Sequence, residues 1–178
     1  MAMPDPYAQA WTVRAKIDPG APWTSPEFFD GEGVGHVWLE VISPLGESME
    51  FGFYPQNPSV RSVQGMIICP DRHGGDKERK TATISLQDVA LGYHAAFDRR
   101  DTRYQLAGYN CASFASDVWQ AMTGKPLPNG LLIPNPSSAA ESVRIERELR
   151  KAFNGQPMSD GVEDLIEMTS SGVIPPAM

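Results

Sequence analysis

The segment from Tyr104 to Phe114, with the sequence YQLAGYNCASF, holds the residues best suited to chemistry. It places Cys111 between a short extended segment and the start of a predicted helix. A cysteine at a helix N-terminus faces unpaired backbone N–H groups and the positive end of the helix dipole. Both favour the thiolate, which is the nucleophilic form of the side chain. Since Cys69 is the only other cysteine, nothing indicates a disulfide framework, and Cys111 is a candidate nucleophile.

A cysteine nucleophile needs a base, and the chain has three histidines. His36 opens the strongest predicted strand, directly after a glycine-rich loop, where a side chain is often presented to a cleft. His94 falls inside a predicted helix and His73 in a polar loop, where a surface or structural role is usual. We therefore take His36 as the candidate base. The alternatives are an ordinary strand-end histidine and, for Cys111, a buried structural cysteine.

Two further side chains are candidates for supporting roles. If the hairpin after His36 is centred on Leu45, paired residue numbers add up to about 90, which puts Tyr54 opposite His36. The Tyr54 hydroxyl is then a candidate orienting group for the imidazole, or else a packing or substrate-contact residue. Gln105 lies six residues before Cys111. Its amide is a candidate oxyanion donor beside the Cys111 N–H, or else belongs to an exposed strand residue.

The elements that must position these groups follow from the hydrophobic pattern. Strands are predicted at Trp11–Ile17, His36–Ile42, Met49–Tyr54, Gly65–Cys69 and Lys80–Ile84, and the second and third form a hairpin. Helices are predicted from the Ser85 and Asp88 capping box to about Arg99, from Cys111 to Gly124, from Ser137 or Ser138 to Phe153, and briefly at 162–168. We expect an α+β fold with an antiparallel sheet packed against helices. A single domain would span 11–155, between a flexible N-terminus (1–10) and a C-terminal tail (156–178).

The spacing of apolar residues also predicts the buried face of each helix. In the first helix this face holds Leu86, Val89, Ala90, Tyr93 and Phe97. In the second it holds Phe114, Ala115, Val118, Trp119 and Met122. In the third it holds Ala140, Val143 and Leu149.

The composition narrows the classes of partner. With 178 residues, of which 41% are hydrophobic and 21% charged, the chain is long enough for one domain with a core. Its net charge of −7 argues against nucleic acid and anionic membrane surfaces, which are bound by basic faces. No stretch approaches the roughly 18 apolar residues of a membrane span. Without a signal-peptide pattern, we expect synthesis in the cytoplasm and any export by a route without a cleaved signal.

We expect no cofactor and no metal. The segment Cys69–His73 holds three residues of metal-ligating type, but their spacing matches no zinc template and no second ligand pair accompanies them. The sequence also lacks a phosphate-binding loop, a dinucleotide fingerprint and a G-x-S-x-G elbow.

The pattern Tyr104-x-Leu106-x-x-x-Asn110-Cys111-x-x-Phe114 resembles the cysteine motif of the lecithin:retinol acyltransferase-like proteins. With the NlpC-type peptidoglycan hydrolases, these belong to the papain-like superfamily. In its circularly permuted branch the histidine strand precedes the cysteine helix, as His36 precedes Cys111 here. The resemblance covers about residues 31–128 and is greatest to bacterial members, several of which are toxins or amidase effectors of type VI secretion systems. It implies a papain-like fold with His36 as base and Cys111 as nucleophile.

The resemblance implies a cysteine hydrolase that cleaves amide bonds, above all in peptidoglycan peptides, as a secreted antibacterial amidase or endopeptidase. Such an effector acts in the periplasm of a target cell and is inhibited by an immunity protein. Ala112-Ser113 replaces the acidic-histidine pair of the acyltransferase branch, which disfavours lipid chemistry. Two alternatives stay open on this fold: thioester chemistry on lipid acyl chains, and a protease or deamidase acting on a host protein. A third is a non-catalytic interaction module with Cys111 in its core.

Overall fold

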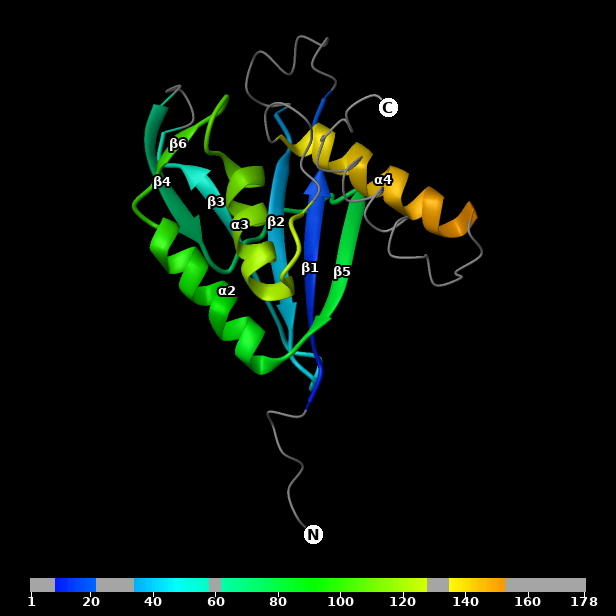
Figure 1. Ribbon diagram of the computed structural model, residues 1–178. Coiled ribbons are helices and arrows are strands. Elements are labelled where there is room, and N and C mark those ends of the chain that lie inside the picture. The colour runs from blue at the N-terminus through cyan, green and yellow to red at the C-terminus, as the bar shows by residue number, and fades with distance from the viewer. Residues whose placement is uncertain (1–8, 22–33, 58–61, 128–134, 153–178) are drawn as a thin grey trace, which may run out of the picture.

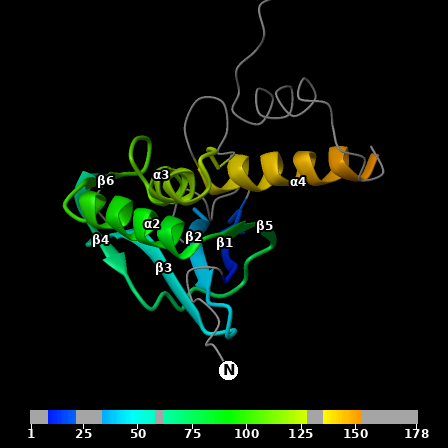
Figure 2. The same cartoon turned by 60° about the horizontal axis from the view of Figure 1, so that its bottom comes forward.

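Six antiparallel strands form one sheet, and the three helices of the described residues all lie on one of its faces (Figures 1 and 2). This computed structural model describes residues 9–21, 34–57, 62–127 and 135–152. The strand order across the sheet is β5-β1-β2-β3-β4-β6. The fold is therefore of the expected α+β class, with an antiparallel sheet packed against helices.

The predicted elements are present within the described residues, with bounds that differ by no more than three residues. The strands are β1 (Trp11–Asp18), β2 (His36–Ile42), β3 (Ser48–Pro55), β4 (Ser62–Ile68), β5 (Glu78–Ile84) and β6 (Arg103–Gln105). The helices are α2 (Leu86–Arg99), which begins at the predicted capping box, α3 (Cys111–Thr123) and α4 (Pro136–Ala152). The segment 1–8, the helix predicted at 162–168 and the tail after 152 lie outside the described residues.

The β2–β3 hairpin has the predicted register, since Leu39 pairs with Phe51 and Glu40 with Glu50. Side chains alternate between the two faces of a strand. Leu39 and Phe51 point toward the helices and belong to the main hydrophobic core. Trp38 is just as buried, but it lies outside that core, on the face of the sheet turned away from the helices. His36, two residues earlier, shares this second face.

The helices cover the core much as their apolar spacing predicts. The whole predicted stripe of α3 is buried: Phe114, Ala115, Val118, Trp119 and Met122. In α4, Ala140 and Val143 are buried as predicted, while the side chain of Leu149 lies outside the described part. Each large apolar side chain that is buried in this way contributes about 1.5–3 kcal/mol to folding.

The buried face predicted for α2 is wrong in part. The buried residues are Val89, Gly92 and Ala96, whereas Ala90, Tyr93 and Phe97 are exposed. The reason is the close packing of α2 on α3. A Cβ atom added to Gly92 would lie 2.8 Å from Met122 Sδ, so a larger residue there would displace the Met122 side chain. The small residues of α2 therefore face α3, and its large aromatic residues turn outward.

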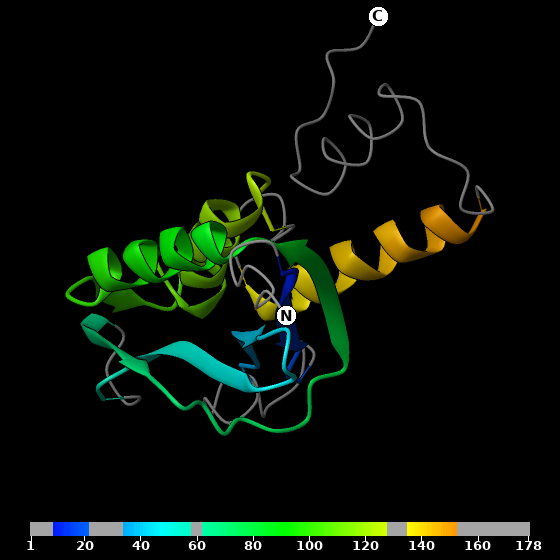
Figure 3. The same ribbon diagram turned by 90° about the horizontal axis from the view of Figure 1, so that it is seen from below.

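The connection from β4 to β5, residues 69–77, crosses the face of the sheet that the helices leave free (Figure 3). Because β4 and β5 lie toward opposite edges, it passes over β3, β2 and β1 in turn. Backbone hydrogen bonds fasten it at both ends. The Asp71 N–H donates to the Glu50 carbonyl at 2.8 Å, and the Lys77 N–H to the Ile17 carbonyl at 2.9 Å. This connection helps to cover His36 and Trp38 on the second face.

Candidate active site

Cys111 is the first residue of α3, as predicted. The preceding residue, Asn110, is the N-cap, and its side-chain oxygen accepts hydrogen bonds from the backbone N–H groups of Ala112 and Ser113 at 2.9 and 3.2 Å. Asn110 also donates to the Leu106 carbonyl at 3.1 Å, which fixes the turn before the helix. The local sequence thus sets the position of the thiol, whose residue is only 1% exposed.

The buried sulfur lies among polar groups. The His36 imidazole, the Val37 N–H and the Tyr104 hydroxyl all lie close enough to the Cys111 sulfur to affect its ionisation. Burial alone would raise the pKa of the thiol. The His36 imidazole outweighs burial, with smaller contributions from the Val37 N–H and the Tyr104 hydroxyl, and the pKa of Cys111 falls below its ordinary value. The site therefore favours the thiolate.

The pKa of His36 is shifted in the opposite direction to that of Cys111. Burial would lower the pKa of the imidazole, but Asp71 and Cys111 outweigh it and raise the pKa of His36 from 6.5 to about 9. Since the pKa of the thiol falls and that of the imidazole rises, the two shifts together favour a thiolate–imidazolium pair over a neutral thiol and imidazole. Such a pair holds an activated nucleophile and a proton donor side by side.

Asp71, on the crossing connection, supplies a third group. Its Oδ2 lies 3.5 Å from His36 Nε2, and the two residues are 5% and 4% exposed. This ion pair is longer than a direct N–H···O hydrogen bond, and Nε2 has no hydrogen-bond partner among the described residues. Catalytic hydrogen bonds are often long in the absence of substrate. Because Nε2 faces Asp71, Nδ1 is the ring nitrogen left to exchange a proton with Cys111.

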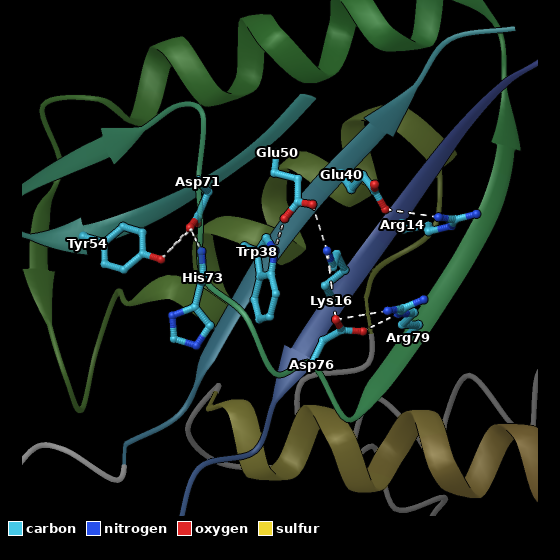
Figure 4. Close-up of polar contacts among 10 residues, drawn as sticks. All are labelled: Arg14, Lys16, Trp38, Glu40, Glu50, Tyr54, Asp71, His73, Asp76 and Arg79. Atoms are coloured by element: carbon cyan, nitrogen blue, oxygen red, sulfur yellow. Dashed lines mark hydrogen bonds and ion pairs between the residues drawn. The ribbon is translucent and has the colours of Figure 1, made fainter. Parts of the chain in front are cut away.

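The Asp71 carboxylate is itself held in place. The Tyr54 hydroxyl lies 2.9 and 3.0 Å from its two oxygens, and the His73 backbone N–H donates to Oδ1 at 2.9 Å (Figure 4). Burial would raise the pKa of Asp71, but the nearby His36 imidazole and the hydrogen bonds from His73 and Tyr54 outweigh it and lower the pKa. Asp71 is thus an ionised carboxylate aimed at the imidazole.

Gly52 provides the room for this contact. It pairs with Trp38 of β2, directly beneath the place where His36 and Asp71 meet. A Cβ atom at position 52 would lie 2.8 Å from His36 Nε2 and would overlap Asp71 Oδ2 even more closely. Only glycine leaves space for both side chains.

Tyr54 was predicted as a candidate orienting group for the imidazole. In the structure its hydroxyl contacts Asp71 and not His36. Its ring packs against the imidazole, with 4.2 Å between the ring centroids. Burial and the Asp71 charge raise the pKa of Tyr54, so the hydroxyl remains a donor. Tyr54 can therefore orient His36 by packing and through the carboxylate.

Gln105, the candidate oxyanion donor, is not brought to the thiol. It is exposed on β6, and its amide donates to Ser62 Oγ at 3.4 Å. Successive residues of a strand point to opposite sides, so the neighbouring Tyr104 takes the inward position. The Tyr104 hydroxyl lies close to both the sulfur and the backbone N–H of Cys111. Burial raises the pKa of Tyr104, which keeps the hydroxyl protonated.

Asp71 and Tyr104 are the two residues of the site to which the sequence analysis gave no role. Both lie in segments that stood out in the sequence: Tyr104 opens the cysteine motif, and Asp71 lies between Cys69 and His73. The signal for Tyr104 was the alternation along its strand. For Asp71 it was an acidic residue directly after the strand that pairs with the hairpin.

The two remaining histidines differ in their distance from the site. His73 is half-buried beside the site, and its ring centroid lies 4.9 Å from that of His36 and 4.9 Å from that of Trp38. Its Nε2 lies 3.6 Å from Asp18 Oδ2. His94 is exposed on α2. His73 therefore borders the imidazole, while the structure leaves His94 on the surface.

Comparison with known proteins gives no relative. No family model matches the chain. No curated protein and no solved structure matches it either. Among the described residues, no three His, Cys, Asp or Glu side chains are grouped to hold a metal ion. The described helices are also too short or too polar to cross a membrane.

Proposed function

We propose that this protein is a cysteine hydrolase that cleaves amide bonds, with Cys111 as nucleophile, His36 as general base and acid, and Asp71 as the residue that orients His36. The observation that carries the proposal is the buried contact between a helix-terminal thiol, an imidazole and a carboxylate. Burying ionisable groups costs folding free energy. Strongly shifted pKa values are concentrated at functional sites, which supports a chemical role for these three.

In the first half of the reaction, Cys111 Sγ attacks the amide carbonyl carbon, and the carbonyl π electrons move to the oxygen. The His36 imidazolium then gives its Nδ1 proton to the amide nitrogen as the C–N bond breaks. An amine leaves, and an acyl thioester on Cys111 remains. In the second half, neutral His36 takes a proton from water, and the hydroxide attacks the thioester. The thiolate leaves, and the carboxylic acid product is released.

The oxyanion formed in both halves needs hydrogen-bond donors that are already in place. The Cys111 N–H and the Tyr104 hydroxyl are close enough to influence each other and lie beside the sulfur. A carbonyl oxygen that enters between them can accept a hydrogen bond from each. This pair replaces the pair of Cys111 and Gln105 expected from the sequence.

The order of the elements supports the finer assignment to a permuted papain-like hydrolase. A strand that opens with the histidine precedes the cysteine helix, and the third group follows the strand next to the hairpin. Together with the Asn110-Cys111 motif, this arrangement favours the peptide stem or cross-link of bacterial peptidoglycan as substrate. The protein would then act as an antibacterial effector in the periplasm of a target cell.

Access to the sulfur sets a requirement on any substrate. Cys111 is 1% exposed, so a substrate carbonyl reaches Sγ only when a neighbouring group moves. Iodoacetamide is a small probe of that movement. Its reaction rate with Cys111 measures thiolate content and access together.

The proposal is tested by incubating purified muropeptides with wild type, Cys111→Ala and Cys69→Ala. Cys69 is a matched control, because it is the other cysteine of the chain and is exposed. Partial desolvation of its sulfur and the nearby Asp71 charge raise its pKa, so it is not an activated thiol. We expect new amine and carboxyl ends in the products from wild type and Cys69→Ala and none from Cys111→Ala. Equal products from wild type and Cys111→Ala would refute a Cys111 nucleophile. The absence of products from every muropeptide would refute the cell-wall substrate.

A further inference from the structure

Glu50 contacts both supports of the candidate site without reaching the reacting atoms. Its Oε2 accepts a hydrogen bond from Trp38 Nε1 at 2.7 Å (Figure 4). Its backbone carbonyl accepts the Asp71 N–H at 2.8 Å. We propose that Glu50 is a positioning residue, which fixes the His36 imidazole through Trp38 while its main chain anchors Asp71. This inference rests on the proposed function of Cys111 and His36.

The first step is the stacking of Trp38 on the imidazole. The two rings are nearly parallel, with an interplanar angle of 12° and 5.7 Å between centroids. Trp38 is fully buried, so its position limits the orientations that the imidazole can adopt. The π face of an indole next to an imidazolium also favours the charged ring. Trp38 therefore affects both the geometry and the protonation of His36.

The second step is the hydrogen bond that fixes Trp38. A buried indole N–H requires an acceptor, and the Glu50 carboxylate provides one at a short, charge-assisted distance. Trp38 lies outside the helix-side core, where apolar packing could otherwise fix it. The orientation of the indole therefore depends on Glu50.

The third step is the balance of the Glu50 charge. Its Oε1 accepts from Lys16 Nζ at 2.8 Å, and this ammonium lies 5.3 Å from the centroid of the Trp38 ring. Lys16 in turn lies 4.0 Å from Asp76, which pairs with Arg79 (Figure 4). Since Lys16 neutralises the carboxylate, the effect of Glu50 on His36 is mainly geometric. A neutral acceptor at position 50 should then serve almost as well.

Glu40 offers a matched control. It pairs with Glu50 across the hairpin and lies on the same face, but its carboxylate bonds to Arg14 at 3.2 Å. Glu40→Ala removes a carboxylate and an ion pair from the same strands. It tests whether any loss in Glu50→Ala comes merely from weakening this face of the sheet.

The test is the rate of iodoacetamide alkylation of Cys111 as a function of pH, with every variant made in the Cys69→Ala background. Three changes are compared: Glu50→Ala, Glu50→Gln and Glu40→Ala. We expect Glu50→Ala to slow alkylation at neutral pH by roughly 10- to 100-fold, the scale of a misplacement near 1 Å. The high-pH side of the pH–rate profile, or alkaline limb, reports the loss of the His36 proton. In Glu50→Ala this limb should also move down from about pH 9. Glu50→Gln should stay within about 3-fold of the parent, and Glu40→Ala should match it, because neither removes the acceptor for Trp38.

Trp38→Phe shows whether the effect passes through Trp38, and it also serves if Glu50→Ala fails to fold. It keeps an aromatic ring but removes the N–H that Glu50 accepts. We expect it to shift the alkaline limb in the same direction, and we expect Glu50→Ala to add little in the Trp38→Phe background. An unshifted profile in Trp38→Phe, or fully additive effects of the two changes, would overturn the proposal. Because alkylation needs no substrate, the outcome is independent of which bond the enzyme cleaves.

Discussion

Gly52→Ala is the sharpest perturbation of the candidate site, because it adds one methyl group at the meeting point of His36 and Asp71. Position 52 is on β3, inside a paired segment of the hairpin, and any L-residue can adopt a strand conformation. The change therefore acts on the site and not on the backbone. It lengthens or breaks the 3.5 Å contact between His36 Nε2 and Asp71 Oδ2.

The size of the effect follows from the room available. The new Cβ would lie 2.8 Å from His36 Nε2, whereas ordinary contact begins at 3.4 Å, so the imidazole must move by about 0.6 Å. The Asp71 oxygen is closer still and must move further. A misplacement near 1 Å costs on the order of 100-fold in rate. Overpacking of this kind also lowers the free energy of unfolding by about 1–3 kcal/mol.

A thermal unfolding curve and a pH–rate profile separate the loss of stability from the loss of site geometry. We expect the Gly52→Ala enzyme to remain folded, with a cooperative thermal transition, but to lose roughly 100-fold in alkylation and cleavage rates at neutral pH. Its alkaline limb should fall from about 9 toward the ordinary histidine value, since Asp71 no longer supports the imidazolium. A folded Gly52→Ala with the wild-type rate and pH profile would show that the contact of His36 with Asp71 has no part in activating Cys111.

Three further outcomes are expected. Asp71→Asn removes the carboxylate that raises the pKa of His36, so the alkaline limb of the alkylation rate should shift down from about 9, and an unchanged limb would contradict its role. Tyr104→Phe should lower kcat roughly 100-fold, as for loss of an oxyanion donor, with little change in KM and a smaller loss in alkylation rate; an alkylation rate that falls as much as kcat would assign Tyr104 to the thiolate alone. The raised pKa of His36 stabilises the fold fully below pH 6.5, and this contribution is lost as pH rises through about 9. Urea unfolding should show a decrease of up to about 3 kcal/mol over that range in wild type and a smaller one in His36→Gln.

The parts of the fold that depend on local pattern could be predicted from the sequence. The β-branched and aromatic residues of β2 and a hairpin centred on Leu45 sufficed to predict the strand bounds and the pairing of Leu39 with Phe51. The sequence predicted a helix from Cys111 to Gly124, which matches α3 and places Cys111 at its N-terminus. These features need only neighbours in the chain.

The features that could not be predicted from the sequence depend on long-range packing. Asp71 reaches His36 because the connection after β4 crosses to the far edge of the sheet, and no local pattern encodes that path. The choice between Tyr104 and Gln105 depended on which side of a three-residue strand faces α3. In α2 the close approach to Met122 selected Gly92 for the interface, although size and hydrophobicity favoured its aromatic residues.

Strand β3 links the packing of the protein to the geometry of the candidate site. Its residues 50, 52 and 54 point to the face away from the helices, where Glu50 holds Trp38, Gly52 makes room and Tyr54 fixes Asp71. The residues between them, Phe51 and Phe53, belong to the hydrophobic core. A slip of one residue would exchange the two sets, burying polar groups and exposing two phenylalanines. The core therefore selects the register, and the register in turn places the three supports of the imidazole and carboxylate.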